Sequence, residues 1–205
     1  MFEFDEDTIE ELNQRERPIM ALFYPAGLTP EMGRSQLFPL IMALKNAGIM
    51  ESVVLDHAEN YPEAAETGYI PKLLEVIDED PARRGKGLVL LGHSSSIGPT
   101  LGLCRALGDR VQRLYLVATR APTTYMLKDP KFTPISQTMM AIAGDRDPKM
   151  NNWRQFTTGE FGLAAIEADR RGMLIPKGGV DPATGAYQDC PLFDIIVGDL
   201  SQTFL

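Results

Sequence analysis

The sequence predicts an α/β protein with a mostly parallel sheet of about six strands flanked by helices. Short apolar segments alternate along the chain with longer segments whose apolar residues recur at helical spacing. Parallel strands need crossover connections, which such an alternation supplies. The strand segments are almost continuously apolar, as expected when helices cover both faces of a sheet.

Each expected strand is a short apolar run. The six strands are residues 19–24, 52–56, 88–91, 114–118, 138–143 and 161–166. Functional sites of open parallel sheets collect at the carboxyl ends of the strands. The residues that follow these six runs are therefore the first place to look for function.

Four longer segments carry apolar residues at helical spacing. They are residues 31–47, 69–77, 97–107 and 191–204, with a further short helix expected at 151–157. Pro39 lies inside the first of them and is expected to kink or delay that helix, because proline removes a backbone hydrogen bond.

Composition predicts a single cytoplasmic domain over residues 18–205, preceded by an acidic segment at 1–17. The 205 residues are 44% hydrophobic, and no apolar run is long enough to cross a membrane. The first residues lack the basic start and apolar core of a signal peptide. A net charge of −8 argues against nucleic acid as a partner.

Cofactor and metal sites are not expected. The two cysteines, Cys104 and Cys190, are too isolated for a metal site, and the acidic residues show no spacing specific to a metal. The segment 98–102 has glycines but lacks the Gly-Lys-Ser/Thr ending of a phosphate loop.

The most informative motif follows the third expected strand. Gly92-His93-Ser94-Ser95-Ser96 stands between that strand and a helix, which is the order of a nucleophile elbow. In the pattern G-x-S-x-G, Ser94 holds the nucleophile position, and Ser96 replaces the last glycine. The alternative is that the three serines only cap the next helix, since serine is a favoured N-cap.

With these motifs the chain resembles the type II thioesterases of polyketide and nonribosomal-peptide pathways, which are serine hydrolases of the α/β-hydrolase fold. The likeness extends to four other segments, in the same order as in that family. They are the entry loop at 23–27, the strand ending in R-A-P at 114–122, the G-x-x-D-P loop at 144–148 and the W-R-x-x-T-T-G-x-F segment at 153–161.

The resemblance implies roles for individual residues. It places Ser94 as nucleophile and Asp147 as the acid of the triad, with Asp145 as the neighbouring alternative. The backbone N–H groups of Ala26 and Ser95 would form the oxyanion hole. A loop aspartate that only orders the turn before Pro148 is the other interpretation of Asp147.

The chain departs from that family at the catalytic histidine. By alignment Arg170 occupies the expected place, and arginine stays protonated, so it holds anions but accepts no proton. A salt bridge between Arg170 and Asp147 is the structural alternative. The two histidines are His57 and His93. His93 is expected to pack away from Ser94, and His57 is either a base or a hydrogen-bonded loop residue.

A second departure is the lid. Only residues 123–137 join two strands where the family has a long helical cover, so a reduced α/β-hydrolase fold without a lid domain is expected. An inserted loop near 177–189 either replaces part of the lid or is a surface loop.

Three functions remain open on this basis. The first is an enzyme of secondary metabolism that hydrolyses, transfers or cyclises the acyl group of a carrier-protein or coenzyme A thioester, or of a small-molecule intermediate derived from one. The second is a non-hydrolytic enzyme on the same scaffold, such as a cyclase, lyase or epimerase. The third is a catalytically degenerate protein that binds a carrier domain or partner. The sequence leaves the oligomeric state open.

Overall fold

The computed structural model describes residues 17–61, 68–119, 133–144, 148–168, 172–181, 184 and 186–205. Six strands form one sheet in the order β2-β1-β3-β4-β5-β6, and every neighbouring pair is parallel. The strands are β1 (Ile19–Phe23), β2 (Ser52–Leu55), β3 (Leu88–His93), β4 (Val111–Val117), β5 (Thr138–Gly144) and β6 (Phe161–Ile166). The predicted fold class is confirmed, and β1 separates β2 from the strand that leads into the serine run.

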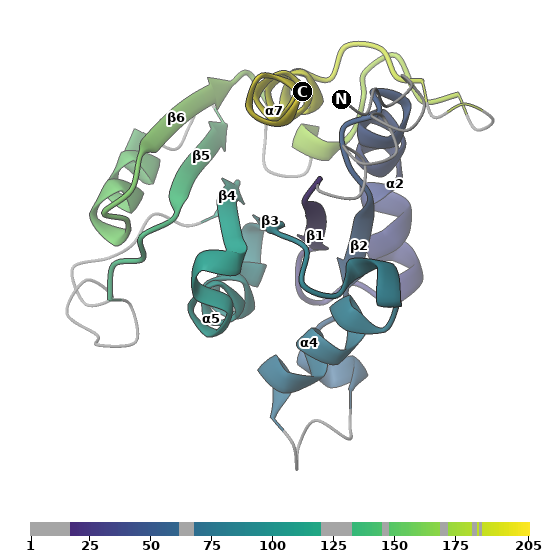
Figure 1. Ribbon diagram of the computed structural model, residues 1–205. Coiled ribbons are helices and arrows are strands. Elements are labelled where there is room, and N and C mark those ends of the chain that lie inside the picture. The colour runs from purple at the N-terminus through teal and green to yellow at the C-terminus, as the bar shows by residue number, and fades with distance from the viewer. Residues whose placement is uncertain are drawn as a thin grey trace, which may run out of the picture.

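Helices cover both faces of the sheet (Figure 1). One face packs against α2 (Pro30–Asn46) and α7 (Pro191–Phe204), and the other against α4 (Tyr69–Asp78) and α5 (Ile97–Leu107). Successive strand residues alternate between the two cores, since Met20 and Leu22 join the first whereas Ala21 and Phe23 join the second. The continuously apolar strands are thus buried on both sides.

Helix α2 corrects one expectation from the sequence. It runs unbroken from Pro30 to Asn46, so Pro39 neither delays nor interrupts it. Thr29 caps the helix, its Oγ1 accepting a hydrogen bond from Met32 N at 3.3 Å. Proline at 39 deprives the Ser35 carbonyl of its helical partner, but Ser35 is exposed, so that carbonyl is not shut away from solvent.

Short 3₁₀ segments join the main elements. They are η1 (Ala58–Asn60), η2 (Pro81–Arg83), η3 (Ser94–Ser96), η4 (Gly108–Arg110), η6 (Pro148–Phe156) and η7 (Gly172–Leu174). The helix expected at 151–157 is therefore η6, a 3₁₀ segment. Its Trp153 and Phe156 are buried against the core on the α5 side of the sheet, with ring centroids 5.1 Å apart.

Helix α7 is joined to the sheet by a polar cluster as well as by apolar packing. Asp199 accepts a hydrogen bond from Arg113 Nη2 at 2.6 Å and another from the Tyr115 hydroxyl, and both donors lie on β4. Burial and the bond to Asp199 hold the pKa of Tyr115 well above its usual range. The cluster orients the last helix across the sheet.

The described part of the 177–189 loop pairs with itself through a bridge between Val180 and Tyr187. The Thr184 carbonyl accepts a hydrogen bond from Asn46, at the carboxyl end of α2. Helix α2 has 17 residues and is therefore about 25 Å long. The entry loop leads from β1 to its amino end, so Thr184 lies at the opposite end of the helix from the entry loop.

Among the described helices, none has the length and apolar character needed to cross a membrane. The expected acidic segment at 1–17 lies outside the described residues except for Arg17, and so does most of 123–137.

Candidate active site

The serine run forms a sharp turn between β3 and α5. Ser94 has φ of 55°, a left-handed conformation that serine rarely adopts. Such strain persists only where the surrounding structure enforces it, and it is typical of the nucleophile elbow. Ser94 is half-buried, and no hydrogen bond joins its hydroxyl to another described residue.

Close packing beneath the turn explains the glycine before it. A Cβ at Gly92 would lie 2.4 Å from Thr100 Oγ1 on α5, so only glycine lets the helix approach the strand this closely. Thr100 is fully buried, and its hydroxyl donates to the Ser96 carbonyl at 2.7 Å.

Ser96, which replaces the last glycine of the motif, is also fully buried. Its hydroxyl donates to the His93 carbonyl at 2.7 Å, so burial leaves it with a partner. Ser96 is the N-cap of α5, but its side chain makes no capping hydrogen bond. Capping therefore does not explain the serine run in this structure.

The entry loop after β1 lies beside the elbow. Gly27 has φ of 87°, which allows the loop to turn from the strand into α2. The backbone N–H of Ala26 donates to Ser95 Oγ at 2.9 Å, and both residues are exposed. The structure thus brings together three of the residues singled out in the sequence, Ala26, Ser94 and Ser95.

A cavity of about 620 Å³ opens at this point. Its walls come from the entry loop, from α2, from the elbow and from the segment after η7. The lining residues are Pro25, Ala26, Gly27, Leu28, Gln36, His93, Ser94 and Ile175. Most of these are apolar, so the cavity suits a group with a large apolar part beside Ser94.

His57 lies at the end of β2, two strands away from the elbow. Its Nε2 is 2.6 Å from the Tyr24 carbonyl, and its ring meets the Tyr24 ring edge to face at 5.0 Å. A carbonyl only accepts hydrogen bonds, so the proton is on Nε2 and the ring donates. His57 therefore supports the residue from which the entry loop departs.

Tyr24 is held at a second point by Asp56, the neighbour of His57. The Tyr24 hydroxyl donates to Asp56 Oδ1 at 3.0 Å, and Arg34 Nη2 donates to Asp56 Oδ2 at 2.8 Å. Burial, together with the bond to Asp56, holds the pKa of Tyr24 well above its usual range. The bond between Tyr24 and Asp56 thus fixes the root of the entry loop to β2.

Of the remaining candidates, the structure describes His93 alone. Asp145, Asp147 and Arg170 lie outside the described residues, and so does the expected salt bridge between the last two. His93 is the last residue of β3, is 2% exposed and is among the residues that line the cavity.

Sequence reasoning missed three features of this region. The Ser95 side chain, rather than only its backbone, bonds the entry loop. Gln36 and Ile175 line the cavity, yet they lie far from any motif in the sequence. The bond between Tyr24 and Asp56 could have been predicted from the sequence, because each residue stands at the end of a strand and the two strands are neighbours in the sheet.

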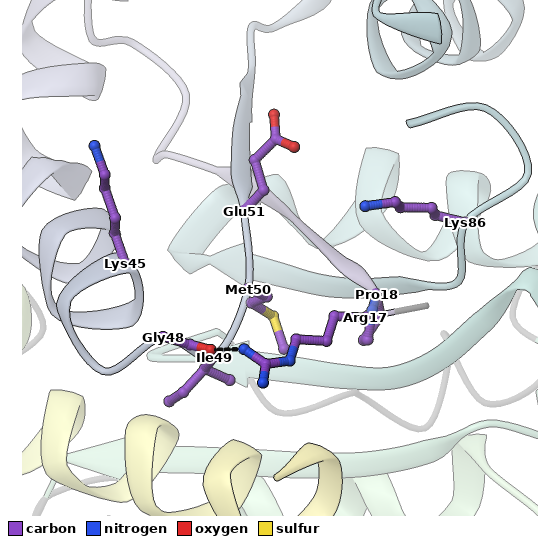
Figure 2. Close-up of a pocket in the computed structure, with 8 residues that line it drawn as sticks. All are labelled: Arg17, Pro18, Lys45, Gly48, Ile49, Met50, Glu51 and Lys86. Carbon is purple, nitrogen blue, oxygen red and sulfur yellow. Dashed lines mark hydrogen bonds between the residues drawn. The ribbon is translucent and has the colours of Figure 1, made fainter. Parts of the chain in front are cut away.

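A second cavity, of about 490 Å³, lies at the opposite edge of the sheet (Figure 2). Pro18, Glu51 and Lys86 line it, and these residues come just before β1, β2 and β3. Arg17 is bound there to the Gly48 carbonyl, and Glu51 accepts a bond from Arg83 at 2.8 Å. None of the described residues that line this cavity is a serine or cysteine, so we assign the candidate active site to the carboxyl edge.

Comparison with solved structures decides the fold. The chain is similar to the Vlm2 thioesterase domain bound with a dodecadepsipeptide (TM-score 0.56, 14% identity, covering 92% of this chain and 94% of that one). It is also similar to human thioesterase 2 (0.56, 10% identity, 93% and 98%) and to mouse alpha/beta hydrolase domain-containing protein 10 (0.58, 14% identity, 90% and 88%).

The chain has an α/β-hydrolase fold. At these identities the likeness shows the fold alone. No model of a known protein family matches the sequence, and no curated protein matches it. Within this fold Ser94 follows the strand that carries the elbow, and the Ala26 loop follows the neighbouring strand.

The hydrogen bond from His57 to the Tyr24 carbonyl predicts that His57 supports the entry loop and is not the catalytic base. His57→Ala should slow covalent modification of Ser94 by a phosphonate about tenfold, because the entry loop loses one hydrogen bond of about 1–2 kcal/mol. His57→Gln, which keeps a donor, should recover most of the rate. If His57 were the base, His57→Gln would react as slowly as His57→Ala, because the amide of glutamine does not act as a base. Thermal unfolding of each variant checks that the fold is retained.

Proposed function

We propose that this protein processes acyl thioesters in natural-product biosynthesis, with Ser94 as nucleophile. The observation that carries the proposal is the left-handed backbone of Ser94, on the wall of a cavity shared with the entry loop. Serine tolerates this conformation at a cost of about 1–3 kcal/mol, which a mere connection between strand and helix would not need.

In the proposed reaction, Ser94 Oγ attacks the thioester carbonyl carbon. The C–S bond then breaks, an ester to Ser94 forms, and the serine proton leaves with the departing thiol. Water, or a hydroxyl or amine of the substrate, next attacks the ester and restores the serine. The product is accordingly an acid, a transferred acyl group or a ring.

Thioesters suit this chain better than amides do. The two histidines of the sequence are His57, bonded to Tyr24, and His93, which precedes the elbow on β3. A thiol has a pKa of about 8.5, so a thiolate leaves with little help from an acid, whereas an amine must be protonated first. The resemblance gives Asp147 the place of the triad acid, which orients a base. In this proposal a water or a group of the substrate takes the proton of Ser94, and Arg170 holds a substrate anion because arginine stays charged.

We expect the acyl group to arrive on a carrier protein or on coenzyme A. The apolar walls at Leu28 and Ile175 are suited to the acyl chain, while the thiol portion stays toward solvent. The similarity to thioesterase structures supports this choice of substrate, and a cytoplasmic setting accords with it.

The test is covalent labelling followed by intact-protein mass spectrometry. A serine-reactive phosphonate should add one mass equivalent to the wild-type protein and none to Ser94→Ala. Ser94→Ala should also lower turnover of an acyl-thioester substrate by at least about 1,000-fold, because a nucleophile cannot be replaced by a methyl group.

Ser201→Ala is a suitable matched control. Its hydroxyl donates to the Val197 carbonyl within α7, away from the cavity, so the variant should label like wild type. A wild-type protein that takes up no label, or a Ser94→Ala variant that turns over thioester normally, would rule out the serine mechanism.

The bond from His57 to Tyr24 favours a second candidate, a protein that binds its substrate or a carrier domain without hydrolysing it. In that case an acyl-thioester analogue would raise the melting temperature of the protein while wild type stayed unlabelled. Non-hydrolytic chemistry on the same scaffold would show instead as an altered product mass without any acyl-enzyme.

A further inference from the structure

We propose that the side-chain hydroxyl of Ser95 is a donor to the oxyanion that forms during acyl transfer. This role rests on the proposed function of Ser94. The family resemblance implies a role in the oxyanion hole only for the backbone N–H of Ser95. The structure adds the side chain, because Ser95 Oγ stands 2.9 Å from the backbone nitrogen of Ala26.

The backbone N–H of Ala26, in the entry loop, points at Ser95 Oγ. The N–H of Ala26 lies where the loop faces the elbow, and it is bonded to Ser95 Oγ. An oxygen at that place accepts the hydrogen bond that an oxyanion would otherwise receive. In this inference the hydroxyl lies between the amide and a substrate bound at Ser94.

A hydroxyl in this position still has a proton to give. The oxygen of serine accepts from Ala26 N–H, and its own O–H is left as a donor. Within the described residues the Ser95 side chain makes no other hydrogen bond, and Ser95 is exposed. Accepting one hydrogen bond strengthens the next one in a chain, so the amide polarises the hydroxyl toward the substrate oxygen.

The chain of hydrogen bonds crosses three neighbouring strand ends. His57, after β2, donates to the Tyr24 carbonyl after β1, and Ala26 of the same loop donates to Ser95 after β3. Both ends of the entry loop are fixed in this way before substrate arrives. Preorganised donors of this kind stabilise developing charge without reorganising during the reaction.

The experiment compares the labelling rate of Ser94 in wild type, Ser95→Ala and Ser95→Thr, with a phosphonate whose oxygen occupies the oxyanion hole. We expect Ser95→Ala to react about 100-fold more slowly, and Ser95→Thr, which keeps the hydroxyl, to remain within about fivefold of wild type. Turnover of a thioester should show the loss in kcat, with KM changed by less than about threefold.

Two results would overturn the inference while leaving the proposed function intact. Ser95→Ala labelling as fast as wild type would show that the hydroxyl has no part in the reaction. Faster labelling would show that it only blocks the Ala26 amide. Absence of label on the wild-type protein would instead overturn the proposed function, and this inference with it. Thermal unfolding of each variant excludes loss of the fold as the cause.

Discussion

Gly92→Ala is expected to destabilise the protein by about 3 kcal/mol and to slow phosphonate labelling of Ser94 about 100-fold. The new Cβ would lie 2.4 Å from Thr100 Oγ1 and 3.1 Å from Thr100 Cβ, so strand and helix must move apart. That movement displaces the turn between them, which holds Ser94. Chemical denaturation and the labelling rate measure the two effects separately.

A matched control is Gly98→Ala, at the start of α5. A Cβ at Gly98 meets nothing within 4 Å, so this variant should label normally and be more stable by up to about 1 kcal/mol. The pair Gly92→Ala with Thr100→Ala removes the closest contact and should recover part of the loss. Equal stability of wild type and Gly92→Ala would contradict the packing described here.

The sheet was predictable because its signal is local. Each strand is a short apolar run, and all six runs appear as strands. Their bounds differ from the expected ones by at most three residues, the most at β4, which begins at Val111. Pro39 does not delay the helix, which begins at Pro30, because the cost of a proline in a helix depends on what surrounds the freed carbonyl, and Ser35 is exposed. The segment 151–157 was given as a helix but forms 3₁₀ turns, with Trp153 and Phe156 buried in the core.

The elbow was predictable for a similar reason, since Gly92 and Ser94 stand in one short motif between a strand and a helix. The contacts that give the site its shape were not. The bond between Ala26 and Ser95 joins residues 69 positions apart, and that between His57 and Tyr24 spans 33 positions. No periodicity encodes such pairs, because they arise only when the strand ends meet at one edge of the sheet.

Asp199→Ala is expected to lower the free energy of unfolding by about 2–4 kcal/mol without changing the labelling of Ser94. The substitution leaves Arg113 and the Tyr115 hydroxyl without the carboxylate that both of them bind. Arg113 and Asp199 side chains are 15% and 19% exposed, so water only partly replaces the lost contacts. Chemical denaturation of the variant measures the loss.

Glu75→Ala serves as the control for this prediction. Glu75 pairs with Lys72 at 3.2 Å on the surface of α4 and is 67% exposed, so its loss should cost less than about 0.5 kcal/mol. Asp199→Asn keeps one acceptor oxygen, so its loss of unfolding free energy should lie between those of Asp199→Ala and Glu75→Ala. A loss from Asp199→Ala as small as that from Glu75→Ala would show that apolar packing alone holds α7.

The same cluster gives stability a dependence on alkaline pH. The pKa of Tyr115 is raised in the folded protein, by burial first and by the bond to Asp199 second. An unfolded tyrosine releases its proton near pH 10, whereas the folded one retains it, so the contribution is complete below about pH 10 and declines above it. Tyr115→Phe removes this titration, and its stability should therefore fall less steeply than that of wild type as the pH rises past that value. An unchanged slope would show that Tyr115 ionises alike in both states, and that Asp199 holds β4 through Arg113 alone.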